Sequence, residues 1–111
     1  LGAWWKEETG LPLPLGGNAI RRDLGPEAIR ELSVILKSSI RYALDHREEA
    51  LGAAMKYARD MGRDLADRFV GMYVNDYTLD YGPKGREAIA LFLDRARQAG
   101  LVPPVGVEWA P

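Results

Sequence analysis

The sequence predicts a mostly α-helical chain, with about four helices plus one short strand. Apolar residues recur at three- and four-residue steps through most of residues 26–100, as they do along one face of a helix. Proline and glycine punctuate these periodic segments in the way they mark helix starts and ends. Only residues 18–22 have the composition of a good strand. The chain has 111 residues, 47% of them apolar, which suffices for one domain with a modest core.

The N-terminal quarter is expected to contain little regular structure. Residues 1–8 are predicted to form a short amphipathic helix that ends at Gly10. The Leu-Pro-Leu-Pro-Leu run at 11–15 should be an extended connector, because its prolines remove alternate N–H donors. Asn18–Arg22 would follow as the strand. A lone strand leaves both edges unpaired, so its partners should lie outside this chain or in a second copy of it.

Two helices are predicted over residues 26–62. The first spans 26–45 and begins with Pro26, a residue suited to the first helical position. Its apolar face would comprise Ile29, Leu32, Leu36, Ile40 and Ala43. The second would be capped by Asp45 with Glu48 in a capping box, and Gly62 would end it. Its buried stripe would comprise Leu51, Ala54, Met55 and Ala58.

Two more helices and a tail complete the chain. Arg63–Asn75 is predicted to be helical, and Gly71 should allow another backbone to approach closely. The apolar face of this helix would comprise Leu65, Phe69, Met72 and Tyr73. The last helix should start at Gly82–Pro83 and close at Gly100, with Ala88, Ile89, Phe92, Leu93 and Ala96 facing inward. The proline-containing tail, 101–111, should be extended.

Composition narrows the range of partners. The net charge of -1, from 15 basic and 16 acidic residues, gives no electrostatic reason to expect nucleic acid or an anionic membrane. No apolar stretch approaches the roughly 20 residues that span a bilayer. The absence of cysteine excludes disulfides and thiolate metal sites, and a single histidine excludes a histidine-rich metal site within one chain.

Few side chains in the sequence are candidates for catalysis or ligand binding. His46 is the only side chain with an ordinary pKa near neutrality, and we interpret it as a solvated residue at a helix junction. The polar and aromatic stretch 73–82 allows two interpretations: it presents hydrogen-bond donors to a ligand, or it is a capping loop in which Asn75 ends one helix. Trp4 and Trp5 are adjacent and therefore point in different directions. One of them should be in the core and the other at an interface or a cleft.

The chain begins with Leu1 rather than Met, which we interpret as the start of a segment from a longer protein. Several of its strings resemble the 1,4-dihydroxy-6-naphthoate synthase family of menaquinone biosynthesis by the futalosine route. The Leu-Pro-Leu-Pro-Leu-Gly string at 11–16 is the most specific of them. The other matching strings are Leu1–Trp5, Thr9–Gly10, Arg21–Leu24, Arg41–Leu44, Arg47–Leu51 and Tyr73–Asn75.

The resemblance implies a cytoplasmic enzyme with the two-lobed α/β fold of type 2 periplasmic binding proteins. Residues 1–25 would then be a crossover or hinge segment, 26–100 the C-terminal helical part of the first lobe, and 101–111 a tail. Such enzymes act as carbon–carbon lyases on cyclic de-hypoxanthinyl futalosine and release a three-carbon fragment. The resemblance implies no metal ion and no organic cofactor. The family's expected histidine base lies upstream of the matched region, so no catalytic residue is assigned here and the chain alone should be inactive.

The resemblance also implies a substrate-binding segment. The connector is expected to line the ligand cleft, where its backbone N–H groups could contact a substrate carboxylate. The candidate residues are Leu13, Pro14, Leu15, Gly16, Gly17 and Asn18, and, with less support, Tyr73 and Asn75. The alternatives are a solute-binding module without chemistry, a chorismate dehydratase-type sister enzyme, and a helical domain that self-associates through its strand.

Overall fold

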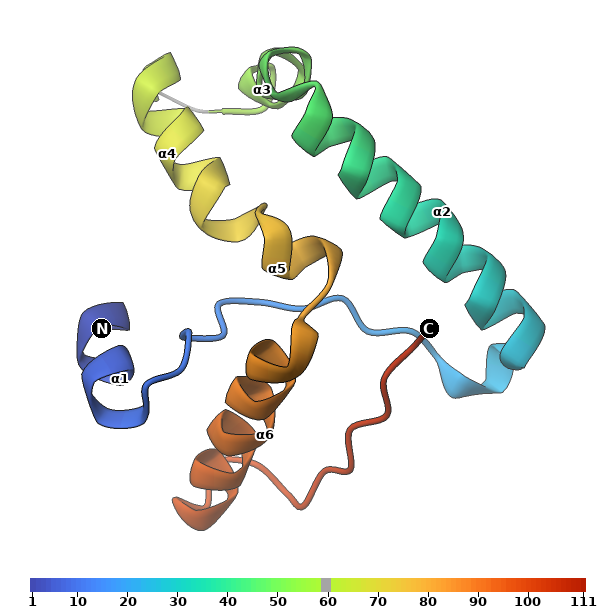
Figure 1. The fold of residues 1–111 in the computed structure, drawn as a ribbon, viewed down its shortest axis with the longest axis vertical. Coiled ribbons are helices and arrows are strands. Elements are labelled where there is room, and N and C mark those ends of the chain that lie inside the picture. Colours follow the sequence, from blue (N-terminus) through green and yellow to red (C-terminus); the bar gives the residue numbers. More distant parts are fainter. Residues whose placement is uncertain (59–60) are drawn as a thin grey trace. The chain divides into compact units, whose positions relative to one another are not determined.

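The computed structural model describes residues 1–58 and 61–111. These residues contain six α-helices and one short 3-10 helix (Figure 1). They form two compact units. The terminal unit comprises Leu1–Asn18 with Asp80–Ala110, and the central unit comprises Ala19–Leu79 with Pro111.

The predicted short strand is wrong, and so is the predicted number of helices. The described residues contain no strand, and Asn18–Arg21 has no regular structure. Arg22–Leu24 instead forms the 3-10 helix η1, in which the Gly25 N–H donates to the Arg22 carbonyl at 3.2 Å. The Arg21 guanidinium also bonds the Asp23 carboxylate two residues away, so local contacts replace strand pairing. Self-association of the chain stays a prediction.

The two-lobed α/β architecture implied by the resemblance is also absent from these residues, because they contain only helices and irregular segments. A sheet needs at least two strands that pair with each other, and no described residue belongs to a strand. The fold class of this chain is therefore all-α rather than helices with a strand.

Two helices form the regular part of the terminal unit, α1 (Gly2–Thr9) and α6 (Gly82–Gln98). Helix α1 ends at Gly10, which has a φ of 70° and donates its N–H to the Lys6 carbonyl. Helix α6 ends before Gly100, also at positive φ, where the Leu101 N–H reaches back to the Ala96 carbonyl at 2.9 Å. Glycine adopts this left-handed conformation without steric cost, so both predicted ends are confirmed to within two residues.

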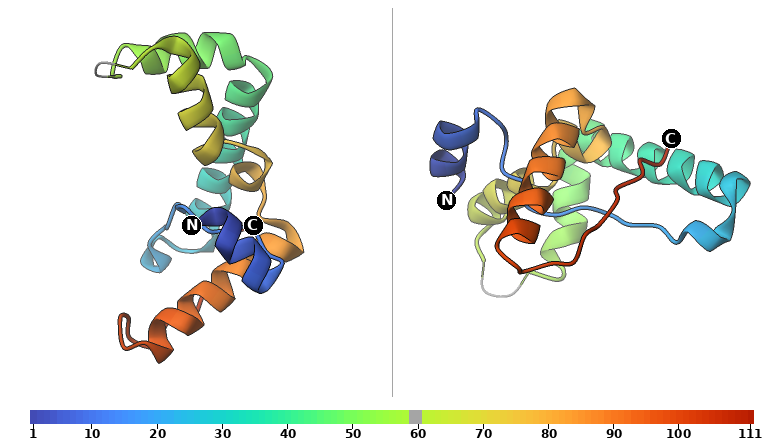
Figure 2. Two further views of the ribbon diagram at one scale, coloured as in Figure 1. Left: turned by 90° about the vertical axis from the view of Figure 1, so that its left-hand side faces the viewer. Right: turned by 90° about the horizontal axis from the view of Figure 1, so that it is seen from below.

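Four helices form the central unit: α2 (Pro26–Asp45), α3 (Arg47–Met55), α4 (Arg63–Tyr73) and α5 (Asp76–Leu79). The predicted bounds of α2 are confirmed, with Pro26 in its first turn. Helix α3 contacts both α2 and α4, while α2 also contacts η1 and α5. Figure 2 shows α3 at the end of α2 that lies away from η1.

The predicted boundaries of the second helix are wrong. Helix α3 begins after His46, no side chain caps it, and it ends at Met55. Gly62 does not end it in a left-handed conformation, because Gly62 has a φ of -64° and precedes α4. Of the predicted stripe, Leu51 is buried, whereas Ala54 is exposed.

Arg47 joins α3 to α4. Its Nε donates to the Asp67 carboxylate at 2.9 Å, and one terminal nitrogen donates to the Asp67 backbone carbonyl at 3.0 Å. The same nitrogen lies 2.9 Å from the position that a Cβ on Gly71 would take. Gly71 therefore leaves room for the Arg47 side chain, not for another backbone as the sequence suggested.

The apolar faces of α2 and α4 are largely uncovered. No residue of α2 is buried, and Ile35 is 63% exposed. On α4 only Ala66 is buried, whereas Leu65 is 59% and Phe69 48% exposed. The amphipathic pattern of both helices is real, but the predicted burial of their apolar faces is wrong for this chain. Large apolar side chains that stay exposed on one helix face can be a contact site for a partner.

The pKa of Tyr42 is raised by a hydrogen bond from its hydroxyl to the Glu49 carboxylate at 3.1 Å, and the negative charge of Glu49 adds to the effect. The bond stabilises the folded chain below the ordinary tyrosine pKa of about 10, and this contribution is lost as pH rises through the raised pKa. We expect Glu49→Ala to lower the pKa of Tyr42 toward its ordinary value. Absorbance titration at 295 nm measures this, with Tyr42→Phe identifying the signal among the five tyrosines. If Tyr42 titrates identically in the unsubstituted chain and in Glu49→Ala, the effect of Glu49 on the pKa of Tyr42 is contradicted.

Candidate functional site

The beginning of the connector, Leu11–Asn18, is fixed by Trp5. The indole Nε1 donates to the Pro12 carbonyl at 3.0 Å, and the Trp5 side chain is buried. Thr9 completes the turn, since its hydroxyl donates to the Trp5 carbonyl at 2.7 Å and accepts from the Leu11 N–H at 3.1 Å. Leu11 itself is buried. The chain therefore leaves α1 along a defined path into the connector.

Trp5 is in turn held by α6. The Phe92 ring meets it edge-on at a centroid distance of 5.9 Å, and the Arg95 guanidinium lies 5.2 Å from the indole centroid. Trp4 is 52% exposed, so the prediction that only one of the two tryptophans belongs to the core is confirmed.

At the far end of the connector, the Tyr81 side chain occupies the space beside Gly17. A Cβ placed on Gly17 would lie 2.9 Å from the Tyr81 hydroxyl oxygen, closer than real Cβ contacts come. The same test on Gly16 finds nothing within 4 Å. The Tyr81 ring contacts Trp109 edge-on at 5.6 Å, and the Arg86 guanidinium lies 5.3 Å from the Trp109 centroid.

Between these two ends the connector presents backbone to solvent. Leu13 and Pro14 are half-buried, and the residues from Leu15 to Asn18 are exposed. Within residues 1–58 and 61–111, the N–H groups of Leu13 and of Leu15–Asn18 donate no hydrogen bond. An unpaired N–H group can donate to an anion such as a carboxylate, because hydrogen bonds to a charged acceptor are stronger than neutral ones.

Tyr73 and Asn75 belong to the central unit, whereas the other six predicted site residues belong to the terminal unit. The Asn75 amide nitrogen lies 3.3 Å from the carbonyls of Gly71 and Met72, and its oxygen accepts from the Tyr77 N–H at 3.0 Å. Asn75 therefore closes α4, as the capping interpretation of this stretch expected, and it also opens α5, which the sequence did not predict. A ligand-binding role for either residue stays a prediction.

Thr78 and His46 have local roles as well. The Thr78 hydroxyl accepts from the Asn75 N–H at 3.1 Å and donates to the Tyr73 carbonyl at 2.7 Å. His46 is exposed at the α2–α3 junction, where its ring stacks on Tyr42 at 4.0 Å. Its Nδ1 lies 3.0 Å from the Tyr42 carbonyl oxygen. The junction interpretation of His46 is confirmed.

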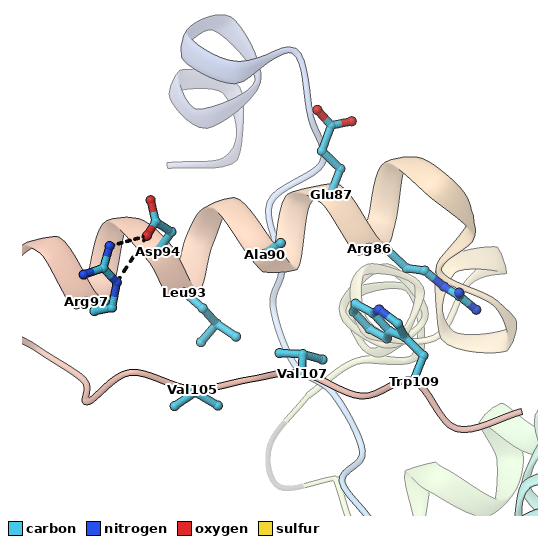
Figure 3. Close-up of a pocket in the computed structure, with 9 residues that line it drawn as sticks. All are labelled: Arg86, Glu87, Ala90, Leu93, Asp94, Arg97, Val105, Val107 and Trp109. Atoms are coloured by element: carbon cyan, nitrogen blue, oxygen red, sulfur yellow. Dashed lines mark hydrogen bonds and ion pairs between the residues drawn. The ribbon is translucent and has the colours of Figure 1, made fainter.

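An open pocket of about 400 Å³ lies between α6 and the C-terminal tail (Figure 3). Apolar side chains from both segments face it, and Arg97 is paired with Asp94 at 2.8 Å on its rim. No predicted site residue lines this pocket, whose walls comprise Arg86, Glu87, Ala90, Leu93, Asp94, Arg97, Val105, Val107 and Trp109.

Sequence reasoning identified the connector but missed two residues that contact it or support that contact. Tyr81 lies in the polar and aromatic stretch at 73–82, yet nothing in that stretch distinguishes it from its neighbouring tyrosines. Trp109 lies in the tail, which was expected only to be extended. Its position among prolines and valines gives no sign of a contact with Tyr81.

None of the helices in the described part of the chain is long and apolar enough to cross a membrane.

Comparisons with known proteins agree on one family. Residues 1–98 match the family described as "Menaquinone biosynthesis". Two relatives are named "1,4-dihydroxy-6-naphtoate synthase". The relative from Thermus thermophilus is 44% identical over 104 residues, and that from Streptomyces coelicolor 41% identical over 108 residues. The matches cover 94% and 97% of this chain but 38% of each relative.

A solved structure shows the same similarity. The crystal structure of a protein from Archaeoglobus fulgidus matches with a TM-score of 0.82 and 43% sequence identity, over 90% of this chain and 38% of that one. The chain thus spans about 38% of the length of the proteins it matches. The resemblance to 1,4-dihydroxy-6-naphthoate synthases drawn from the Leu-Pro-Leu-Pro-Leu-Gly string is confirmed, and the chain belongs to the menaquinone biosynthesis family.

Proposed function

We propose that residues 1–111 form the C-terminal part of a 1,4-dihydroxy-6-naphthoate synthase. The complete enzyme would convert cyclic de-hypoxanthinyl futalosine to 1,4-dihydroxy-6-naphthoate as a carbon–carbon lyase, with release of a three-carbon fragment. One observation carries the proposal. The connector is held at Pro12 by the Trp5 hydrogen bond, lies beside the Tyr81 hydroxyl at Gly17, and leaves exposed, unbonded N–H groups between and beside these points.

In this proposal the connector binds the carboxylate of the substrate. Gly16 and Gly17 have no side chains, so a ligand can approach their N–H groups without steric hindrance. Leu13 and Leu15 would give this segment an apolar side against which the carbocycle packs. The connector needs no large rearrangement to bind, because Trp5 already fixes its first turn.

The residue that abstracts the proton would come from the rest of the enzyme. His46 is unsuited to this role, since it is stacked on Tyr42 at a helix junction and its Nδ1 lies 3.0 Å from the Tyr42 carbonyl oxygen. Binding groups without a base do not give turnover. We therefore expect the isolated chain to be inactive.

The exposed apolar faces of α2 and α4 would contact the remaining part of the enzyme. Residues such as Ile35 and Phe69 expose large apolar side chains that a complete protein would bury. The matched relatives are long enough to supply this cover, because the chain spans only 38% of each.

The proposal is tested with a chimaera in which residues 1–111 replace the matching part of the Thermus thermophilus relative. Formation of 1,4-dihydroxy-6-naphthoate from the cyclic futalosine substrate, followed by liquid chromatography, should occur with the chimaera and not with the isolated chain. His46→Ala in the chimaera is the matched control and should keep full activity. A folded chimaera without turnover, or turnover by the isolated chain, would contradict the proposal.

A further inference from the structure

Gly16 and Gly17 are adjacent in the sequence but differ in their surroundings. Neither has a positive φ. Among the described glycines, those with a positive φ are Gly10, Gly25, Gly82 and Gly100. The backbone conformation therefore does not require glycine at position 16 or 17. What distinguishes them is space, since a Cβ on Gly17 would meet the Tyr81 hydroxyl oxygen at 2.9 Å and one on Gly16 would meet nothing within 4 Å.

Tyr81 has little freedom to move away from Gly17. Its ring meets the Trp109 ring edge-on, with the ring planes 63° apart, and the Arg86 guanidinium lies over Trp109. Its backbone is fixed too. The Asp80 carboxylate accepts the Gly82 N–H at 2.8 Å, and the Tyr81 carbonyl accepts the Gly85 N–H at 3.0 Å in the first turn of α6. The contact with Gly17 is therefore made by a side chain held by α6 and by the tail.

We propose that Tyr81, supported by Trp109, is a positioning residue that sets the location of the Gly16, Gly17 and Asn18 N–H groups. The Trp5–Pro12 hydrogen bond fixes the connector at one end, and at the other end the Tyr81 hydroxyl oxygen lies 2.9 Å from the position that a Cβ on Gly17 would take. This inference rests on the proposed function of the connector, because it assigns the Tyr81 contact a role in orienting groups that bind substrate. It also gives the C-terminal tail a role in substrate binding.

The test uses steady-state kinetics of the chimaera with the cyclic futalosine substrate. Gly17→Ala should raise KM roughly tenfold with little change in kcat, because displaced N–H groups weaken binding. Gly52→Ala is the matched control and should change KM by less than about twofold, because Gly52 lies in α3, outside the connector, and its added methyl group meets nothing within 4 Å. Tyr81→Ala and Trp109→Ala should each raise KM as well, since the support of Gly17 is lost.

Rescue distinguishes positioning from general damage. Tyr81→Phe removes the oxygen atom that a Cβ on Gly17 would meet. The Gly17→Ala/Tyr81→Phe double variant should therefore reverse most of the increase in KM caused by Gly17→Ala. A KM for Gly17→Ala equal to that of Gly52→Ala would overturn the inference, as would a double variant with a KM no lower than that of Gly17→Ala alone.

The contact can also be tested if the chimaera shows no turnover and the proposed function fails. In thermal unfolding of the 111-residue chain, Gly17→Ala should lower Tm, and adding Tyr81→Phe should restore part of the loss. Coupling between these two substitutions supports the contact whatever the enzyme's activity. Purely additive shifts in Tm would overturn it.

Discussion

Replacing Trp5 with alanine is expected to lower the free energy of unfolding of the terminal unit by about 3 kcal/mol, the lower end of the range for a buried tryptophan. The substitution removes a 4% exposed indole, its edge-on contact with Phe92 and the hydrogen bond to the Pro12 carbonyl. No other side chain in α1 is buried, so nothing else in that helix can compensate. Such a loss is a large fraction of the stability of a small unit.

Trp5→Phe separates packing from hydrogen bonding. It keeps an aromatic ring beside Phe92 but removes the donor for the Pro12 carbonyl, so it should cost about 1 kcal/mol. Trp4→Ala is the control at an exposed position and should change stability by less than about 0.5 kcal/mol. Urea unfolding followed by tryptophan fluorescence, to which Trp109 contributes in all three variants, measures the stability of the terminal unit. Equal effects of Trp5→Ala and Trp4→Ala would contradict the assignment of Trp5 to the core.

Leu51→Ala is expected to destabilise the central unit by about 2 kcal/mol. Leu51 is 4% exposed and is the buried residue of α3, the helix that contacts both α2 and α4. Removing its side chain leaves a cavity at this junction, and the cost of such cavities in other proteins begins near this value.

Leu65→Ala is the matched control for Leu51→Ala, because it makes the same chemical change at a 59% exposed position on α4. It should change the stability of the isolated chain by less than about 0.5 kcal/mol. All three tryptophans lie in the terminal unit, so far-UV circular dichroism is needed to follow the central unit. A Leu65→Ala effect as large as that of Leu51→Ala would show that the apolar face of α4 is already covered in this chain.

The positions of α1, α2 and α6 could be predicted from local signals, whereas the end of α3 could not. Pro26 and the apolar steps that follow it defined α2 to the residue, and the glycines at 10 and 100 defined the ends of α1 and α6. These signals act through the backbone conformation of one or two residues, so they do not depend on what surrounds the helix.

Burial and the strand could not be predicted, because both depend on partners far away in the chain or outside it. Periodicity identified the apolar face of α4 correctly but could not show that Leu65 and Phe69 lack cover. The composition of residues 18–22 suits a strand, but a strand forms only with a neighbour to pair with, and Arg21 instead bonds Asp23. Short-range alternatives prevail where such a neighbour is missing.

The candidate site was predictable in part for the same reason. The alternating prolines required an extended connector, and the structure has no helix or strand there. The contact of Gly17 with Tyr81, and of Tyr81 with Trp109, joins three residues widely separated in the sequence. No local pattern indicates such a contact.

In the proposed function, the connector binds the substrate of a naphthoate synthase through its backbone. The most direct measurement is a nuclear magnetic resonance titration of the glycine-labelled chimaera with 1,4-dihydroxy-6-naphthoate, which carries the carboxylate of the product. The Gly16 and Gly17 amide signals are identified by their loss in the alanine variants. We predict that both signals shift and saturate together with binding, while that of Gly52 in α3 stays in place. Saturable binding that leaves Gly16 and Gly17 unmoved would contradict the account.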